Sequence, residues 1–278
     1  MGAVSQAQVD QEMAFIQETG IEPLYFLEKG YPERLKDLND APVLLFYKGQ
    51  PALNRHHAIG VVGTRRATAY GKAMCRELIA GLASYEPLVV SGLAHGIDET
   101  AHQAALKQEV PTVAVLGHGL HMCYPAQNEG LARQMQQSGG LLTEYTTQVR
   151  TVKDNFPARN RIIAGLLDGL LVVETGTKGG ALITADIADS YNREVMTVPG
   201  RVGDSRSAGC HALIKQHKAY LVEEPADIAY HLGWDLEAPA PRAKAERPAV
   251  EKTPEEQAVM TLMEGYGQLH IDQIAQQV

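Results

Sequence analysis

Cysteine is scarce in this chain of 278 residues, which contains only Cys75, Cys123 and Cys210. The three are odd in number and far apart, so neither a disulfide framework nor the paired spacing of a metal or redox site is indicated. A long apolar run is also missing, and the N-terminus has no cationic segment followed by an apolar one. These absences argue against a membrane span and a secretory signal. We expect a cytoplasmic protein with no membrane partner.

An excess of positive charge is missing as well, because 33 acidic residues outnumber 25 lysines and arginines and give a formal net charge of −8. The chain therefore lacks the overall basic coat of many nucleic-acid-binding proteins. A local basic groove remains compatible with this total, since recognition depends on the field at a site. Apolar residues make up 45% of the chain, which is enough for a sizeable core.

Apolar, β-branched runs recur from residue 58 onward, with helical stretches between most of them. The runs read AIGVVG, PLVVSG, PTVAVLG, GLLTE, GLLVVETG and EVMTVPG. Such strands, alternating with amphipathic helices, predict a doubly wound, mostly parallel Rossmann-like α/β sheet over residues 58–234. A short helical and extended lead-in, 1–57, precedes this domain, and its helix is predicted to end at Gly20.

The C-terminal part of the sequence has a different composition. Residues 235–256 alternate proline, alanine and charge, which predicts a flexible linker because such a segment cannot bury a core. Residues 257–278 then place apolar side chains at a spacing that fits two short helices. We interpret this last segment as a partial, winged-helix-like domain.

Glycine-rich turns follow several of the predicted strands, at the sheet edge where ligands of such folds bind. Glycine lets a ligand approach the backbone, and a following helix N-terminus favours an anion. These turns favour a phosphate site, with a purely structural role as the alternative. The turn GTRRATAYG lacks the pattern G-x-G-x-x-G, and no Walker sequence occurs, so NAD and Walker-type nucleotide binding are disfavoured. We expect no cofactor.

A series of motifs occurs in fixed order: VVGTRRATAYG, VVSGLAHGIDETAHQAAL, TVAVLGHGLHMCYPAQNEGL, FPARNRIIAGL, VVETGTKGGALITADIA and VPG. In sequence and spacing they resemble the bacterial DNA-processing protein A family (DprA, also called Smf), from about residue 31 to residue 222. The resemblance implies a non-catalytic, homodimeric Rossmann-like protein that binds single-stranded DNA. It also implies that the protein protects incoming DNA and helps to load the recombinase RecA in natural transformation and recombination.

The resemblance places the DNA pocket around the turn GTR and the motif FPARNR, which a hydrophobic helix over 162–167 is predicted to follow. Physical reasoning agrees, since residues 150–161 carry four cations against one carboxylate, and an aromatic ring can stack on a base. The alternatives are that Phe156 is a core residue, that Arg159 caps a helix, and that Arg161 pairs with Glu174. The predicted nucleic-acid contacts are Gly63, Thr64, Arg65, Gly92, Lys153, Phe156, Arg159, Asn160, Arg161, Lys178, Gly179 and Gly180.

The resemblance also implies a dimer contact around the stretch CHALIKQHKAYLV. Leu213, Ile214 and Tyr220 are the candidate contacts, and all three would equally suit an ordinary core.

An enzyme is the main alternative to a binding protein. Asp98 and His102 are four residues apart, as two metal ligands on one helical face would be. Asp98 stands where the helix of GIDETAH should begin, however, so we predict that it is the N-cap and expect neither a metal site nor a catalytic residue. A nucleoside-monophosphate phosphoribohydrolase would carry a P-G-G-x-G-T-x-x-E loop, and ETGTKGGALITAD lacks that order. A nucleotide-sensing regulator that uses the same crevice stays open.

Overall fold

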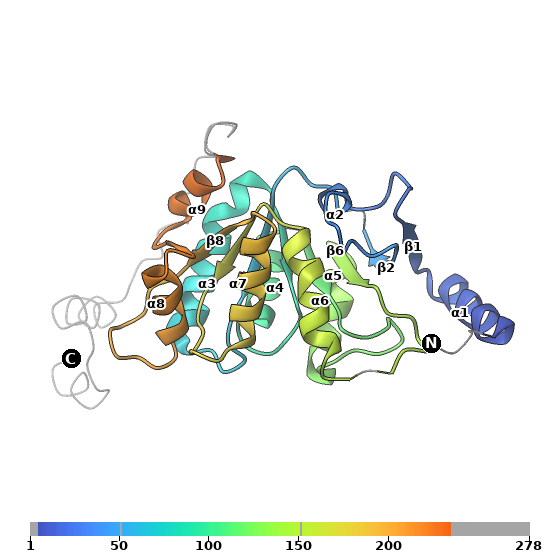
Figure 1. The fold of residues 1–278 in the computed structure, drawn as a ribbon. Helices are drawn as coiled ribbons and strands as arrows, with labels where there is room; N and C mark the ends of the chain where they lie inside the picture. The colour runs from blue at the N-terminus through green and yellow to red at the C-terminus, as the bar shows by residue number, and fades with distance from the viewer. Residues whose placement is uncertain (1–4, 51, 151, 235–278) are drawn as a thin grey trace, which may run out of the picture. The chain divides into compact units, whose positions relative to one another are not determined.

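The computed structural model describes residues 5–50, 52–150 and 152–234, which form an α/β unit around one sheet (Figure 1). The predicted linker, 235–256, and the predicted winged-helix-like segment, 257–278, lie outside the described residues. The strands of the sheet are β1 Glu22–Tyr25, β2 Leu44–Gly49, β3 Ala58–Val62, β4 Leu88–Ser91, β5 Thr112–Val115, β6 Gly139–Thr143, β7 Gly169–Val172, β8 Glu194–Thr197 and β9 Tyr220–Leu221.

The strands lie in the order β1-β2-β6-β5-β4-β3-β7-β8-β9. Neighbours from β6 through to β9 pair in parallel, whereas β2 pairs with β6, and β1 with β2, in antiparallel fashion. The predicted doubly wound, mostly parallel sheet is therefore confirmed. The antiparallel pair β1–β2, which comes from the predicted lead-in, extends the same sheet.

Helices cover both faces of this sheet (Figure 1). Buried side chains of α3, α4 and α9 pack on one face, and those of α6, α7 and α8 pack on the other. The first helix is capped by Ser5 and ends at Gly20, whose φ of 65° is left-handed, as the sequence predicts. The helices are α1 Gln6–Thr19, α2 Glu33–Lys36, α3 Ala69–Leu82, α4 Ile97–Lys107, α5 Glu129–Met135, α6 Asn155–Gly165, α7 Gly180–Ser190, α8 Ala208–Lys215 and α9 Pro225–His231. Two short 3-10 helices are formed by Ala83–Tyr85 and Ala126–Asn128.

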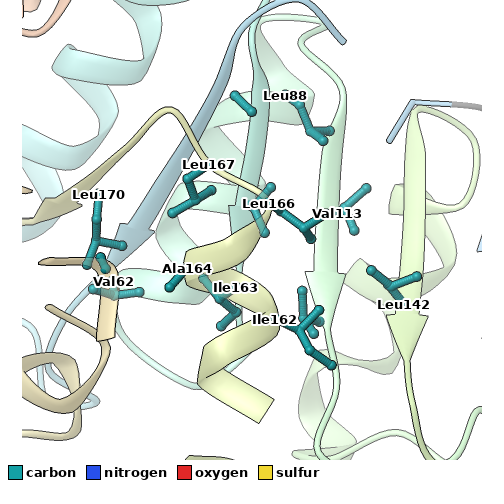
Figure 2. Close-up of a cluster of buried hydrophobic side chains, with 14 of the residues drawn as sticks. Val62, Leu88, Val113, Leu142, Ile162, Ile163, Ala164, Leu166, Leu167 and Leu170 are labelled. Carbon is teal, nitrogen blue, oxygen red and sulfur yellow. The ribbon is translucent and has the colours of Figure 1, made fainter. Parts of the chain in front are cut away.

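The central strands are buried on both faces, which explains their near-continuous apolar sequences. In β3, Val61 packs with the core on the side of α3, and Val62 packs with the core on the side of α6. Figure 2 shows Ile162 and Ile163 of α6, and Leu166 directly after it, in the second of these cores. Each fully buried side chain of this size stabilises the fold by about 1.5–3 kcal/mol. The apolar C-terminal half of α6 thus fixes the polar N-terminal half above the end of the sheet.

The helix α6 begins earlier than the sequence predicts. Its N-cap is Asp154, so the stretch NFPARNR is itself helical. The helix ends at Gly165, so residues 166 and 167 of the predicted helix lie beyond it. Pro157 is tolerated because the first turn of a helix leaves its N–H groups without intrahelical partners. The Asn155 side chain fixes this start by donating to the carbonyl oxygen of Gly117 at 3.1 Å. The polar motif therefore has a defined orientation.

Candidate nucleic-acid interface

A crevice is expected where the order of the parallel strands reverses, between β3 and β7. The chain continues from β3 through β4, β5 and β6 on one side, and returns through β7 and β8 on the other. The glycine-containing turns at residues 63–66 and 176–180 follow β3 and β7, which are neighbours in the sheet. The structure therefore brings together two turns that are more than a hundred residues apart in the sequence.

The turn after β3 packs closely against the neighbouring backbone. The Thr64 N–H donates to the carbonyl oxygen of Glu174 at 2.7 Å, and the Ile97 N–H donates to the carbonyl oxygen of Thr64 at 3.3 Å. Gly96 has a φ of 85°, and a Cβ at this position would lie 2.3 Å from the Thr64 carbonyl oxygen. Only glycine permits this approach. The turn is thus held from two sides, and it presents the exposed Arg65 to solvent.

A cavity of about 610 Å³ lies at this position. It is lined by the turns after β3 and β7, the N-terminal halves of α6 and α7, and Tyr124. Among the predicted contacts, those that line it are Gly63, Thr64, Arg65, Lys153, Phe156, Arg159, Asn160, Gly179 and Gly180. A second cavity, of about 410 Å³, adjoins the first and shares Arg65, Ala94, Tyr124, Phe156 and Arg159 with it. Gly92, another predicted contact, lines this smaller cavity.

Positive charge is concentrated at the larger cavity. Arg65, Arg66 and Lys153 line it with exposed side chains, and in the described part of the chain no carboxylate forms an ion pair with any of them. The Arg206 guanidinium donates to the carbonyl oxygen of Arg66 at 2.6 Å, which adds a cation beside the same turn. Sequence reasoning missed Arg66 and Arg206. A crevice with this local field attracts an anionic ligand despite the negative net charge of the chain.

Phe156 is partly exposed at the junction of the two cavities. Its ring lies against Gly117, where a Cβ would come within 2.9 Å of the Phe156 Cδ1 atom. On another side it meets the ring of Tyr124, with centroids 5.6 Å apart and planes tilted by 44°. Tyr124 is 50% exposed and was missed by the sequence analysis, although an aromatic residue directly before proline in CYPAQN is a recognisable signal. Two aromatic rings, rather than one, thus face this crevice.

Arg159 is buried and belongs to the floor of the crevice. Its Nη1 donates to the carbonyl oxygen of Gly92 at 3.0 Å and to that of Val115, and its Nε donates to the Asn160 side chain at 3.1 Å. Burial lowers the pKa of Arg159 to about 10, partly offset by the carboxylate of Asp98. Arg159 thus caps carbonyl groups that follow β4 and end β5, instead of the neighbouring helix considered from the sequence.

Asp98 is not the N-cap of α4, contrary to our prediction, because Gly96 occupies that position. The Asp98 side chain instead turns inward and accepts hydrogen bonds from the N–H groups of Gly92 and Ala94, at 3.2 and 3.4 Å. Burial raises its pKa to about 6, although Arg159 opposes this shift. Asp98 therefore fixes the turn after β4 from below.

Arg161 pairs with Glu144, at 2.5 Å between Nη2 and Oε2, and not with Glu174 as expected. Glu174 is buried and accepts a hydrogen bond from the Thr68 N–H at 2.8 Å, next to the start of α3. Glu144 directly follows β6, and the packing of α6 brings Arg161 to this carboxylate. Within the described residues Arg161 does not line either cavity, and neither does Lys178, which is exposed beside α7.

The candidate dimer residues lie in different environments. Leu213 is buried in the core with α6 and α7, whereas Ile214 is partly buried. Tyr220 is 50% exposed on the edge strand β9, where its ring stacks on His231 with a centroid distance of 4.1 Å. Among the described residues Tyr220 is thus half exposed at this edge, whereas Leu213 packs inside the domain.

Neither a metal site nor a membrane-spanning helix occurs within the described ranges 5–50, 52–150 and 152–234. No group of three or more His, Cys, Asp or Glu side chains is placed so that it could hold a metal ion there. The His102 side chain, considered above as a metal ligand, forms a hydrogen bond with Thr112, with 2.7 Å between Nδ1 and Oγ1. None of the helices described combines the length and apolar character needed to cross a membrane.

The fold and the crevice define a doubly wound α/β protein with an anion-attracting, aromatic-lined site at its strand-order reversal. The sequence profile of DNA recombination-mediator protein A matches residues 22–233. The chain belongs to this family, whose members are also called DNA processing protein A, DprA or Smf.

Curated relatives support this assignment. DNA processing protein DprA of Streptococcus pneumoniae is 43% identical over 202 residues, which cover 73% of this chain and 71% of the relative. Protein Smf of Escherichia coli is 41% identical over 207 residues, 74% of this chain and 55% of that protein. The chain thus spans between about half and three quarters of the length of these two relatives.

Two solved structures share the fold. The crystal structure of DprA from Streptococcus pneumoniae matches with a TM-score of 0.75 and 37% identity, over 86% of this chain and 80% of that one. DNA processing protein A from Helicobacter pylori, whose structure is described for its single-stranded DNA binding mode, matches with a TM-score of 0.70 and 27% identity. That match covers 77% of this chain and 96% of the other.

Proposed function

We propose that this chain binds single-stranded DNA in the crevice between β3 and β7, without catalysis. The observation that carries the proposal is the presence, in one cavity, of unpaired exposed cations and a partly exposed phenylalanine. Cations neutralise backbone phosphates, and aromatic rings stack on unpaired bases of any sequence. The Helicobacter pylori relative, which is described for the same kind of binding, supports this choice of ligand.

A single strand suits the site better than a duplex. Bases of a duplex are stacked on each other, so their faces are not available to a recessed aromatic ring, whereas a single strand can turn them inward. The positively charged groups line a cavity of about 610 Å³ and do not lie along one helix that could enter a major groove. We expect little sequence preference, since stacking accepts every base.

Binding without catalysis is supported by the state of the acidic side chains near the crevice. The carboxylates of Asp98 and Glu174 are both buried and accept hydrogen bonds from backbone N–H groups. Asp98 lines the larger cavity, but its Oδ2 already accepts the N–H groups of Gly92 and Ala94, and Glu174 does not line this cavity. A phosphoribohydrolase needs a free carboxylate to assist cleavage of the glycosidic bond.

The wider function proposed for the chain is protection of incoming DNA and help in loading the recombinase RecA, in natural transformation and recombination. The name of the matched family, a recombination mediator, supports this role. The protein would act in the cytoplasm as a homodimer, with the exposed edge at Tyr220 as a candidate contact. The predicted contacts Gly92, Arg161 and Lys178 do not line the larger cavity, and they remain part of this proposal alongside the residues that do.

The binding proposal is tested by titrating the chain into matched fluorescent single-stranded and double-stranded oligonucleotides. Tighter binding of the single strand, with similar affinity for several sequences, is the expected result. Equal affinity for both forms would contradict it. Incubation with nucleoside monophosphates separates the enzymatic alternative, because a phosphoribohydrolase would release free base and a DNA-binding protein would not. A nucleotide-sensing regulator would bind the monophosphates without cleaving them, and tighter than it binds the oligonucleotide.

A further inference from the structure

We propose that Tyr124 is a second base-stacking side chain, and that the smaller cavity receives the nucleobase next to the one stacked on Phe156. This inference deepens the proposed function and rests on it. The smaller cavity, of about 410 Å³, adds His95, Pro125, Ala126 and Gln127 to the residues that it shares with the larger one. The two cavities adjoin, and together they offer room for two neighbouring parts of a strand.

The geometry of the two rings determines how bases can stack there. The Tyr124 and Phe156 centroids, 5.6 Å apart, are already at the distance of aromatic contact. A base therefore cannot enter between the two rings and must stack on a face that they turn outward. Both rings line both cavities, so the aromatic pair lies at the boundary between the two cavities, which we call the step. Successive bases on either side of this step would each have an aromatic partner.

The backbone of Tyr124 is fixed although its ring is exposed. Its N–H donates to Nε2 of His118 at 3.2 Å, and Nδ1 of His118 lies 3.0 Å from the carbonyl oxygen of Gly119. His118 is buried, and these two partners select the tautomer that carries its proton on Nδ1. Farther along the same segment, the Asn128 side chain donates to the carbonyl oxygen of Leu93 at 3.0 Å.

The Tyr124 ring is exposed where it lines the two cavities, so a ligand in them can contact it. Half of the Tyr124 side chain is in contact with solvent, and within the described residues its hydroxyl forms no hydrogen bond. A rigid backbone that presents an exposed ring loses little conformational freedom when a base stacks on it.

The chemistry of the smaller cavity suits a nucleobase. Pro125 and Ala126 supply apolar wall, whereas His95 and Gln127 are exposed polar groups that can contact a base edge. Arg65, shared by both cavities, can reach the phosphate that joins the two nucleotides. The ligand class is therefore two consecutive unpaired nucleotides, with aromatic stacking as the sequence-tolerant part of the contact.

The first test compares Tyr124→Ala and Tyr124→Phe in single-strand binding by fluorescence anisotropy. Loss of the ring should weaken binding roughly 5- to 150-fold, the range found for one stacked base, while Tyr124→Phe keeps the ring and should bind almost as wild type. The dependence of affinity on salt should not change, since stacking releases few counterions. Tyr25→Ala is the control, because Tyr25 is 43% exposed on the edge strand β1 and lines neither cavity.

The second test uses oligonucleotides that carry one abasic residue at successive positions. With wild-type protein, two neighbouring positions should weaken binding most. Tyr124→Ala should abolish the effect of one of them, and Phe156→Ala should abolish the effect of the other. Each variant is compared with itself, on intact and on abasic oligonucleotides. The pattern therefore identifies the role of Tyr124 even if one variant is less stable than wild type.

The outcomes separate this inference from the proposed function. If wild-type protein does not bind single strands, the proposed function fails. If wild type binds but Tyr124→Ala binds equally well, or if both abasic effects persist in Tyr124→Ala, then only the second stacking site is overturned.

Discussion

The Arg159 guanidinium donates a hydrogen bond to the carbonyl oxygen of Gly92 at 3.0 Å, across 67 residues of sequence. The same side chain donates to the carbonyl oxygen of Val115, so one arginine of α6 joins the turn after β4 to the end of β5. The first arginine of FPARNR therefore organises the floor of the crevice. Its role is structural, although it also lines both cavities.

Replacing Arg159 by alanine should destabilise the protein strongly. The change leaves the buried carbonyl groups of Gly92 and Val115 without their donor, and an unsatisfied buried group costs about 1–3 kcal/mol. It also removes the charge that opposes the raised pKa of Asp98. We expect a large fall in the melting temperature. Arg65→Ala is the control, since Arg65 is exposed and its loss should change stability by less than about 0.5 kcal/mol. An Arg159→Ala protein that melts like wild type yet loses DNA binding would show a direct contact instead.

The ion pair between Arg161 and Glu144 should couple these two residues energetically. The Arg161 and Glu144 side chains are only 24% and 18% exposed, so the pair is shielded from solvent more than a surface pair. A double-mutant cycle with Arg161→Gln and Glu144→Gln, measured by chemical denaturation, should give a coupling energy of about 0.5–3 kcal/mol.

The exposed pair of Arg133 and Glu129 is a matched control for this cycle, because its nitrogen and oxygen are also 2.5 Å apart. Its coupling should be clearly weaker, as for other exposed pairs on a helix. Equal coupling in the two pairs would mean that partial burial does not strengthen the pair of Arg161 and Glu144. It would then contradict a stabilising role of Arg161 in the fold.

The buried His102 should make folding stability depend on pH. Burial lowers its pKa from 6.5 to about 3, and its Nε2 atom is buried without a hydrogen-bond partner. Between these two pH values the unfolded chain binds a proton that the folded protein does not, so stability is lost as the pH falls from 6.5 towards 3. The slope approaches about 1.4 kcal/mol per pH unit within this window.

The measurement is the difference in unfolding free energy between wild type and His102→Asn from pH 7 to pH 3.5. The raised pKa of Asp98 acts in the opposite sense below pH 6, but Asp98 is present in both proteins and cancels in the difference. The advantage of wild type should shrink as the pH falls. A difference that does not vary with pH would mean that His102 can be protonated in the folded protein.

A chain that ends at Trp234 should fold and should bind single strands with most of the original affinity. Trp234 is 3% exposed and packs against the ring of His57, with centroids 4.5 Å apart, so it completes the core beside α3. The residues after it are predicted from the sequence to be a linker and a partial domain. A matched chain that ends at Gly233 should melt at a lower temperature, because it lacks the indole. If the chain ending at Trp234 folds but does not bind, the crevice is not the complete site.

The sequence predicted the strands of the parallel sheet well, because strands buried on both faces must be continuously apolar. It did not predict β9, since two residues such as Tyr220 and Leu221 carry no periodic signal. Asp98 and Glu174 were assigned wrong partners for a common reason. Their hydrogen bonds reach backbone groups that only the packed turns bring near, and sequence spacing does not reveal such contacts.

The structure places the predicted contacts of 153–161 in three different environments. Lys153 and Phe156 face the crevice, whereas Arg159 lies beneath it and Arg161 lies outside it. Residues on one helix a few positions apart point in different directions, so a motif read as a single unit divides among three environments. Tyr124 escaped notice because it is contributed by a loop that contacts α6 only through the tertiary fold.

The central claim is that the start of α6 is a single-strand contact, and it is tested most directly by salt-dependent binding of Phe156→Ala and Lys153→Ala. Affinity for a short fluorescent single strand is measured at several salt concentrations, together with the melting temperature of each protein. Lys107→Ala is the control, because Lys107 is exposed at the far end of α4 from the crevice.

Phe156→Ala should weaken binding by about 1–3 kcal/mol and leave the salt dependence nearly unchanged, because a stacked base releases few counterions. Lys153→Ala should weaken binding and reduce the slope of log affinity against log salt by ~0.7, since one phosphate contact is lost. Lys107→Ala should behave as wild type in both respects. The account is contradicted if Phe156→Ala lowers the melting temperature greatly but binds DNA normally, for then the phenylalanine is a core residue and not a stacking partner.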